Sequence, residues 1–230
     1  REMRQWKKMV IPFLFAIPII VIVGIENLST CIILLAISFI MIFVATPLWV
    51  PFVVIGLIGV AGAGGLLLTQ GYRMERITVW LDPAASEKGH QTIQGLYAIG
   101  SGGLFGKGLG QSMQKLGFLP EANNDMIFSV ICEELGLFGA LCVLALFFAL
   151  IWRFMVIAVN APDLYGSMIV VGVIAHIGIQ VFINIAVATN TIPNTGIPLP
   201  FISYGGSSLV FMLLEMGLVL SVSRYINVKK

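Results

Sequence analysis

The hydrophobic residues of this chain are gathered into long, nearly continuous runs that shorter polar stretches separate. An α-helix of about 20 apolar residues crosses the hydrocarbon layer of a bilayer. The pattern therefore predicts an all-α polytopic membrane protein, a single membrane domain over 1–230. About six transmembrane helices are expected, at residues 9–25, 28–46, 48–69, 130–152, 166–189 and 207–223.

The composition agrees with this pattern and excludes several classes of protein. Of the 230 residues, 58% are hydrophobic and 10% are charged, whereas a soluble domain carries about 25% charged residues. The net charge of +2 offers no basic surface for nucleic acid. The cysteines Cys31, Cys132 and Cys142 follow no metal-ligand or disulfide pattern, which indicates small buried hydrophobic side chains.

The basic residues predict the orientation of the helices in the membrane. They lie in the opening segment "REMRQWKK", at Arg153 after the fourth predicted helix, and at Arg224 after the sixth. The positive-inside rule then places both termini in the cytoplasm. Segments 70–129 and 189–206 become outer loops. The first residue is not methionine, which indicates a fragment or a processed protein.

The outer loop 70–129 is too long to be a simple connection. Its first part, "YRMERITVWLDP" (72–83), is charged and aromatic, as an interfacial helix is. Its second part (90–110) begins with helical spacing and ends in glycines. The third, "LPEANNDMIFSVICEELG" (119–136), carries four carboxylates and continues into a predicted transmembrane helix.

The glycine run "GSGGLFGKG" resembles a phosphate-binding loop but lacks its requirements. Ser101 stands at the first glycine position, Gly108 follows Lys107 in place of Ser or Thr, and no hydrophobic strand precedes the run. We interpret it as a flexible or re-entrant segment that allows close backbone approach. Alternatively, Lys107 and Lys115 are cations that lie beside an anionic headgroup.

Asp125 is the main candidate for chemistry in the third part. If a helix starts near it, Asp125, Ser129 and Glu133 lie within about 80° of one another, and Glu134 points away. One interpretation is structural: Asp125, or a neighbouring asparagine at 123 or 124, caps the helix. The other is functional: a general base or cation ligand at the mouth of a membrane cavity.

Polar side chains also occur inside the predicted spans. His176, Gln180 and Asn184 are spaced i, i+4, i+8 on one helix face, which predicts hydrogen bonds between helices or the lining of a polar cavity. Glu215 lies midway along the sixth span and needs a partner or solvent, for which His176 is a candidate. His90 has no companion ligands, so no zinc site is expected.

Three segments in order, "YRMERITVWLDP", "AIGSGGLFGKGLGQSMQKLGFLPEANNDMIFSVICEELG" and "IPNTGIPLPFISYGGSSL", resemble the SEDS family (shape, elongation, division and sporulation) and, within it, the FtsW/SpoVE branch more than RodA. SEDS proteins have about ten helices, and this chain resembles spans five to ten. The resemblance implies a multi-pass peptidoglycan glycosyltransferase that polymerises lipid II at the outer face of the bacterial cytoplasmic membrane, in cell division or sporulation. It also implies partners: a class B penicillin-binding protein, and divisome or elongation proteins.

In the family, the essential carboxylate is the Asp of the Pro-Glu-Ala-x-x-Asp motif, which corresponds here to Asp125. It would accept the proton of the GlcNAc 4-hydroxyl of lipid II as that oxygen attacks the anomeric carbon of a nascent glycan strand on undecaprenyl pyrophosphate, with inversion. The predicted substrate-binding residues are Arg73, Arg76, Lys107 and Lys115 as cations for the pyrophosphate, Glu121 as a positioning residue, and Gln94, Glu133 and Ser203.

The sequence leaves three alternatives for the chemistry and the function of the protein. No metal site is assigned, although a divalent cation, Mg²⁺ or Mn²⁺, held by carboxylates is an alternative source of positive charge. A lipid II flippase or transporter is an alternative function, because the polar residues within the spans suit a transport path. A scaffold that docks a penicillin-binding protein is another. The apolar faces of the spans are expected to hold membrane lipids and isoprenoid tails.

Overall fold

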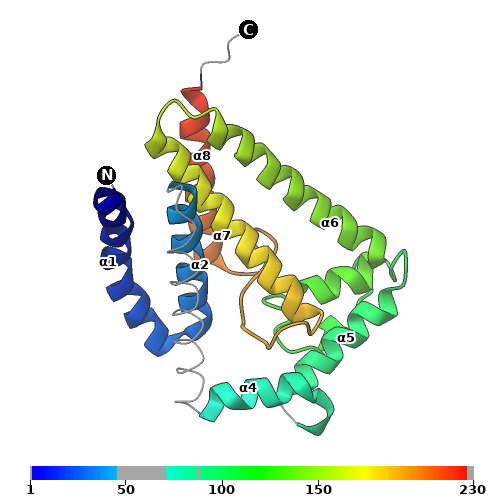
Figure 1. The fold of residues 1–230 in the computed structure, drawn as a ribbon. Helices are drawn as coiled ribbons and strands as arrows, with labels where there is room; N and C mark the ends of the chain where they lie inside the picture. The colour runs from blue at the N-terminus through cyan, green and yellow to red at the C-terminus, as the bar shows by residue number, and fades with distance from the viewer. Residues whose placement is uncertain (1, 46–70, 87–88, 227–230) are drawn as a thin grey trace.

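The computed structural model describes residues 2–45, 71–86 and 89–226 of the chain. Within these ranges the regular structure is entirely helical, as predicted (Figure 1). The elements are α1 (Glu2–Glu26), α2 (Leu28–Ala45), α4 (Gly71–Leu81), the 3₁₀ turn η1 (Pro83–Ala85), α5 (His90–Gly102), the 3₁₀ turn η3 (Gln114–Leu116), α6 (Ile127–Val159), α7 (Leu164–Ala188) and α8 (Gly206–Arg224).

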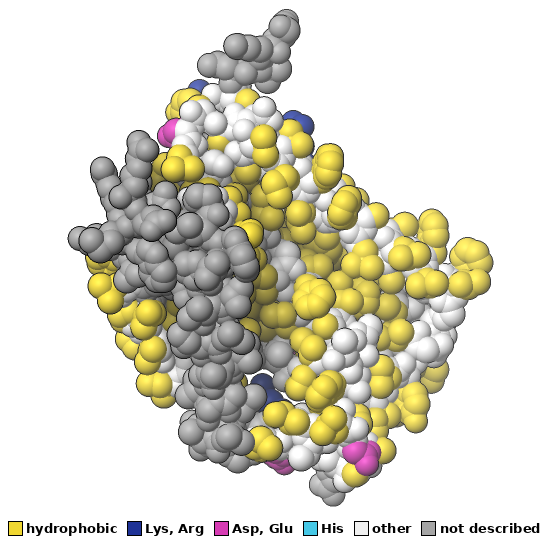
Figure 2. Space-filling model, viewed as in Figure 1, with side chains coloured by type: hydrophobic (Ala, Val, Ile, Leu, Met, Phe, Trp, Pro, Cys, Tyr) yellow, Lys and Arg dark blue, Asp and Glu magenta, His cyan; other side chains and the backbone are white. Residues whose placement is uncertain are grey.

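Five of the six predicted spans correspond to helices of the structure. Helices α2, α6, α7 and α8 are long and apolar enough to cross a membrane, and α1 contains a shorter apolar stretch, Leu14–Glu26. The predicted span 48–69 lies outside the described residues. The chain is therefore a multi-pass membrane protein, and hydrophobic side chains cover much of the face seen in Figure 2.

Helix α7 lies at the centre of the bundle, against α2, α6 and α8. Its fully buried Val170 and Ile177 pack with Phe154 of α6 and with Met212 and Val219 of α8. Helices α4 and α5 lie at one end of the bundle, below the long helices in Figure 1, as expected for an interfacial segment. This end carries the 119–126 segment and the polar loop 189–205, so the predicted outer loops share one side.

Helix α6 is broken at Gly136, whose backbone is left-handed (φ 67°). The break frees backbone groups, and the glycine run bonds to them. Leu137 and Phe138 donate their N–H groups to the carbonyls of Gly103 and Leu104, at 2.9 and 3.0 Å. A Cβ on Gly136 would lie 2.4 Å from the backbone nitrogen of Gly106. The close backbone approach predicted for the glycines is confirmed.

Of the two interpretations of Asp125, the structural one, a side-chain cap by Asp125 or by the asparagine at 123 or 124, is wrong. Helix α6 begins at Ile127, its N-cap residue is Met126, and no side chain caps it. Asp125 lies one residue further back, in a turn that starts at Glu121, where φ is 54°. The backbone N–H groups of Asn124 and Met126 both donate to the Glu121 carbonyl. This turn frees the Asp125 side chain from a capping role.

Candidate active site

A cavity of about 400 Å³ lies beside Asp125, where four separate parts of the chain meet. Helix α4 forms one wall of the cavity. The start of α5 and the 121–125 turn form a second wall, and the loop after α7 forms a third. Its lining residues are Glu75, Arg76, Val79, Trp80, Gln91, Thr92, Glu121, Asp125, Asn190, Asn194 and Gly196. Most of them carry polar groups that can donate or accept hydrogen bonds.

The Asp125 side chain is buried, with 5% of its surface exposed. Gln91 donates from Nε2 to its Oδ1 at 3.4 Å, and Asn194 donates from Nδ2 to Gln91 Oε1 at 3.1 Å. Burial raises the pKa of Asp125 above its usual 3.8, the nearby Glu121 charge adds to the rise, and hydrogen bonds oppose it. A carboxylate with this setting is a stronger base than an exposed aspartate.

The backbone around Asp125 is held by α7 and by the loop that follows it. Asn184, fully buried on α7, donates from Nδ2 to the carbonyls of Asp125 and Ile197, at 2.7 and 2.8 Å. Ser203 donates from Oγ to the Asn124 carbonyl at 2.5 Å and accepts from the Leu199 N–H. Ser203, predicted to bind substrate, therefore contacts the turn that carries Asp125.

Helix α4 contributes the cation of the cavity. Arg76 donates from Nη1 to the Asn194 carbonyl at 3.3 Å, and Trp80 donates from Nε1 to the Asn190 carbonyl at 3.0 Å. These bonds tie α4 to the loop after α7 and place an exposed guanidinium at the rim. The side chain of Arg73, predicted to act with Arg76, lies outside the described part of the structure.

A second cavity, of about 620 Å³, adjoins the first and shares Arg76 and Asn194 with it. Apolar side chains make up half of its lining and come from α2, α4, α7 and the loop after α7. The lining residues are Glu26, Asn27, Leu28, Ser29, Ile32, Arg76, Ile77, Ile183, Ile192, Pro193, Asn194 and Thr195. A polar cavity and a more apolar one thus meet at a single arginine.

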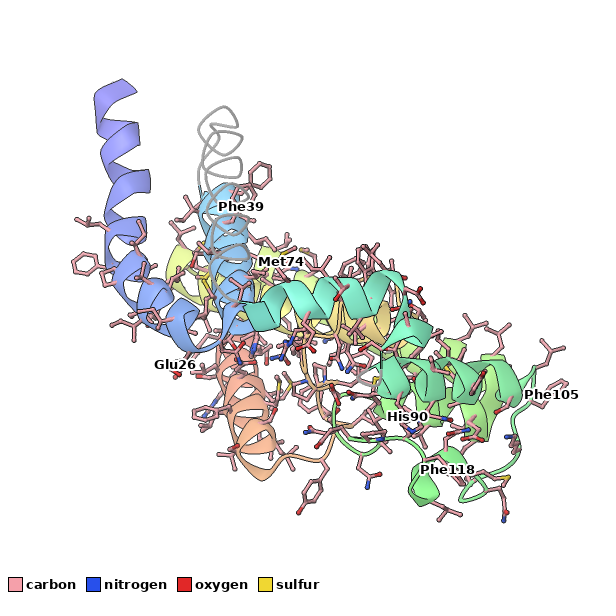
Figure 3. The ribbon with its side chains drawn as sticks, turned by 90° about the horizontal axis from the view of Figure 1, so that it is seen from below. Glu26, Phe39, Met74, His90, Phe105 and Phe118 are labelled. Atoms are coloured by element: carbon pink, nitrogen blue, oxygen red, sulfur yellow. The ribbon has the colours of Figure 1, made fainter. Side chains whose placement is uncertain are left out.

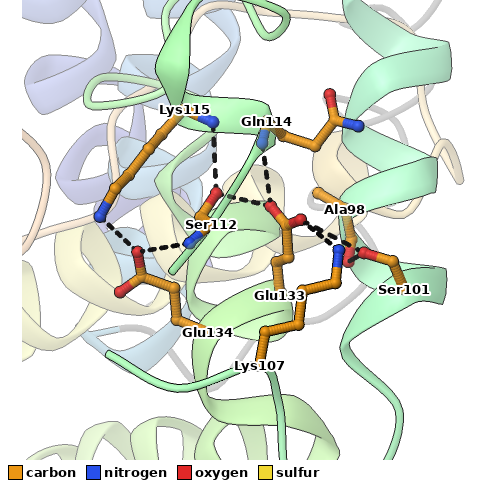
Figure 4. Close-up of polar contacts among 8 residues, drawn as sticks. All are labelled: Ala98, Ser101, Lys107, Ser112, Gln114, Lys115, Glu133 and Glu134. Atoms are coloured by element: carbon orange, nitrogen blue, oxygen red, sulfur yellow. Dashed lines mark hydrogen bonds and ion pairs between the residues drawn. The ribbon is translucent and has the colours of Figure 1, made fainter. Parts of the chain in front are cut away.

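Glu133, Lys107 and Lys115 line neither cavity, so the structure gives no support to their predicted contact with substrate at Asp125. They belong to a separate network of polar contacts (Figure 4). Fully buried Glu133 accepts from Lys107 Nζ at 2.7 Å and from Ser112 Oγ at 2.5 Å. Glu134 accepts from Lys115 Nζ at 2.5 Å. The two carboxylates fix the 103–116 loop to α6.

The other predicted residues divide between the cavity and its surroundings. Glu121 lines the cavity with Asp125. Gln94 is half-buried on α5 and lines neither cavity. Gln91 and Asn194 could not be predicted from the sequence, because single amides in a loop and at a helix start carry no periodic signal. Only the fold brings them to Asp125.

The divalent cation, considered above as an alternative source of positive charge, has few candidate ligands in the structure. Glu75, Glu121 and Asp125 line one cavity. Across the described ranges, however, no three His, Cys, Asp or Glu side chains form a group that holds a metal ion. The cation stays a prediction, and no catalytic step below depends on it.

The polar residues within the spans pair mainly with one another. His176 Nδ1 lies 2.7 Å from Glu215 Oε1, and Gln180 Nε2 lies 2.9 Å from His176 Nε2. The predicted hydrogen bond between helices is confirmed for His176, and the predicted partner of Glu215 is confirmed with it. Asn184 differs, because it bonds backbone carbonyls near Asp125 instead of a neighbouring span.

The fold and the cavity define a polytopic helical membrane protein with a buried carboxylate in a polar cavity at one end of its spans. The family model described as "Cell cycle protein", for FtsW, RodA and SpoVE, matches residues 1–228. The chain therefore belongs to this family, the SEDS proteins.

Among curated relatives, the chain is 53% identical over 203 residues to stage V sporulation protein E of Bacillus subtilis (strain 168). The aligned region covers 86% of this chain and 55% of the relative. It is 36% identical over 226 residues to the probable peptidoglycan glycosyltransferase FtsW of Geobacter sp. (strain M18). This alignment covers 96% of this chain and 62% of that protein. The chain thus spans roughly three fifths of these relatives.

Two solved structures share the fold. A chain from a study of the structural coordination of polymerization and crosslinking by a peptidoglycan synthase complex matches with a TM-score of 0.74 and 27% identity, over 95% of this chain and 62% of that chain. The crystal structure of the rod shape determining protein RodA of Thermus thermophilus matches with a TM-score of 0.63 and 29% identity, over 94% of this chain and 56% of RodA.

Proposed function

We propose that the protein containing this chain is a peptidoglycan glycosyltransferase that polymerises lipid II into glycan strands, in cell-wall synthesis for division or sporulation. The observation that carries the proposal is the buried, hydrogen-bonded Asp125 in a polar cavity that adjoins a more apolar one. The curated FtsW relatives, named as probable peptidoglycan glycosyltransferases, support the reaction class.

The two cavities suit a substrate with a polar head and a lipid tail. A sugar fits the polar cavity beside Asp125, and an isoprenoid chain fits the more apolar cavity between α2, α4 and α7. Arg76, shared by both, then lies where a pyrophosphate would join the two parts. A guanidinium recognises phosphate oxygens by paired hydrogen bonds, which favours this placement.

The reaction is a single displacement at the anomeric carbon of the donor. The 4-hydroxyl oxygen of the acceptor sugar attacks that carbon and forms the new glycosidic bond. The bond between the carbon and the pyrophosphate oxygen of the lipid carrier breaks, and the pyrophosphate leaves with the electron pair. Asp125 accepts the hydroxyl proton. Because the attack is a single step from the face opposite the leaving group, the configuration at the anomeric carbon inverts. Arg76 stabilises the negative charge that develops on the leaving group.

The proposal includes the site's orientation and its partner. The basic ends of the spans favour an active site at the outer face of the cytoplasmic membrane. Lipid-linked sugars supply the leaving group there without nucleotides. The structural match to a chain from a peptidoglycan synthase complex supports assembly with a penicillin-binding protein.

The test is polymerisation of purified lipid II by the full-length protein in detergent, read as glycan strands on a gel. Asp125→Asn is expected to lower the rate about 10²- to 10⁴-fold, the usual contribution of a general base. Asp163→Asn is the matched control, because this carboxylate caps α7 at the opposite end of the bundle. Normal strand formation by the Asp125→Asn protein would exclude the base role.

The same assay separates the enzyme from the alternatives. A flippase forms no polymer in detergent, because its activity needs two compartments. A scaffold predicts that Asp125→Asn weakens binding of the penicillin-binding protein and leaves polymerisation unchanged. The pairing of His176 with Glu215 and Gln180 supports the enzyme over a transporter, since these groups bond one another within the spans.

A further inference from the structure

The loop that follows α5 lies level with the first turn of the spanning part of α6. Its Gly103 and Leu104 carbonyls accept the N–H groups of Leu137 and Phe138. These bonds fix the height of the loop backbone to that of residues 137 and 138. Wherever the membrane surface crosses α6, it crosses this loop at the same level.

The length of α6 places this level at or below the membrane surface. Arg153 is the charged residue near the far end of the helix. The unbroken part of α6 from Leu137 to Arg153 rises only about 24 Å at 1.5 Å per residue, so the surface of a hydrocarbon layer about 30 Å thick lies beyond Leu137, near the break. Leu137 and Phe138 lie on the inner side of that boundary, and the loop backbone bonded to them lies there too.

The loop presents apolar side chains at this level. Leu104 is 64% exposed, Phe105 82% and Leu109 76%, and we call these three the apolar crest. They continue the lipid-facing surface of α6, where Leu137 and Phe138 are exposed as well. Figure 3 shows Phe105 at the outer edge of the molecule, pointing away from the helices, and Figure 2 shows hydrophobic side chains along the same flank.

Both ammonium groups of the loop and the backbone N–H groups at its centre have partners within the protein. The N–H groups of Lys107 and Gly108 donate to the carbonyls of Glu133 and Glu134, each at 2.9 Å. The Lys107 and Lys115 ammonium groups are paired with the side chains of the same two glutamates. A non-helical segment is tolerated at membrane depth only when its backbone groups and charges are satisfied in this way.

We propose that this segment is a re-entrant loop whose apolar crest inserts into the leaflet nearer Asp125. The bilayer is its occupant, because the crest continues the lipid-facing surface of a spanning helix and because the paired glutamates and lysines lie at the boundary. The insertion does not depend on the proposed reaction. It holds α6 at a fixed depth, and with it the turn that carries Asp125.

The test measures the depth of single spin labels on the full-length protein in vesicles of phosphatidylethanolamine and phosphatidylglycerol. Native cysteines are replaced by alanine, and a label is attached at Phe105→Cys. Leu141→Cys, on the exposed side of α6, is the lipid reference, and Asn123→Cys, exposed near Asp125, is the aqueous reference. Collision rates with oxygen, which dissolves in lipid, and with a water-soluble nickel chelate are recorded for each.

The label at position 105 is expected to match the reference at 141, with a ratio of oxygen to nickel collisions several-fold above that at 123. A ratio equal to that at 123 would place the crest in water and overturn the proposal. Low collision rates with both reagents would mean that protein covers the crest, which also overturns it. Because Phe105 is largely exposed, its substitution is not expected to unfold the protein, and thermal unfolding of each labelled variant verifies this.

Discussion

Glu133 provides the most direct test of how the 103–116 loop is held. Its carboxylate is fully buried and accepts from Lys107 Nζ, Ser112 Oγ and the Gln114 N–H, and weakly from Ser101 Oγ, which also donates to the Ala98 carbonyl. Glu133→Ala removes all four acceptor contacts at once. Ser112 is itself fully buried, so its hydroxyl cannot turn to water in the closed loop.

The expected cost follows from these partners. An unsatisfied buried donor costs about 1–3 kcal/mol, and two neutral donors, Ser112 and Gln114, are left without Glu133. The Lys107 side chain is 36% exposed, so its ammonium regains water and adds less. Because the Gln114 N–H bond is only partly buried, we expect about 2–4 kcal/mol, the lower part of the range of about 2–6 kcal/mol for two fully buried donors. This is close to the roughly 3–5 kcal/mol for truncating a fully buried pair.

Amide hydrogen exchange measures the loss of stability in the 103–116 loop itself. Opening of the loop exposes the N–H groups of Lys107 and Gly108, which bond to α6 in the closed state. At 1.4 kcal/mol per tenfold change, 2–4 kcal/mol is an increase of about 30- to 700-fold in exchange for the 103–116 peptides. Asp163→Ala is the control for loss of a distant carboxylate. Exchange within threefold of the unaltered protein would refute the anchoring role of Glu133.

Three further predictions concern other parts of the molecule. Gly136→Ala is expected to destabilise the protein strongly in thermal unfolding, because its Cβ would lie 2.4 Å from the Gly106 nitrogen. Gly103→Ala, also at positive φ but with open space around it, should cost only the backbone strain of about 1–3 kcal/mol. Replacing both His176 and Glu215 by leucine should leave stability near its original value, whereas the Glu215→Leu change alone should lower it, a result that a double-mutant cycle checks. Burial raises the pKa of Asp125, so its contribution to stability is full below the unfolded pKa and is lost as pH rises through the folded pKa. Asp125→Asn should therefore raise the melting temperature at pH 7.5, by an amount that shrinks toward pH 4, while polymerisation by the unaltered protein falls as Asp125 becomes protonated.

The helical spans could be predicted because their signal is local. A run of apolar residues long enough to cross a bilayer has no other stable environment, and helices α2, α7 and α8 end within a few residues of the predicted limits. The start of α6 was harder to predict. Asp125 has the residue type of a cap, yet the left-handed Glu121 turn, which no sequence rule indicates, displaces it from the helix.

The site was only partly predictable for a related reason. Helix periodicity placed Asp125 and Glu133 on one flank, but the glycine run packs against α6 and draws Glu133 into its own ion pair. Gln91 and Asn194, which contact the Asp125 network, are 103 residues apart. Such a pairing depends on how α5 meets the loop after α7, and a single sequence contains no measure of that distance.

The break at Gly136 explains why so many carboxylates precede a membrane helix. A continuous helix would satisfy its own backbone and leave Glu133 and Glu134 at the bilayer boundary without fixed partners. The break lets the glycine run approach closely enough to bond the helix backbone, and that approach delivers Lys107 and Lys115 to the two glutamates. The segment from 127 to 135 is then fixed by the loop at one end and joined at the other to the Asp125 turn, which Asn184 and Ser203 hold. Because both ends are tied by buried or short hydrogen bonds, the position of Asp125 depends on the glycine run even though that run does not line the cavity.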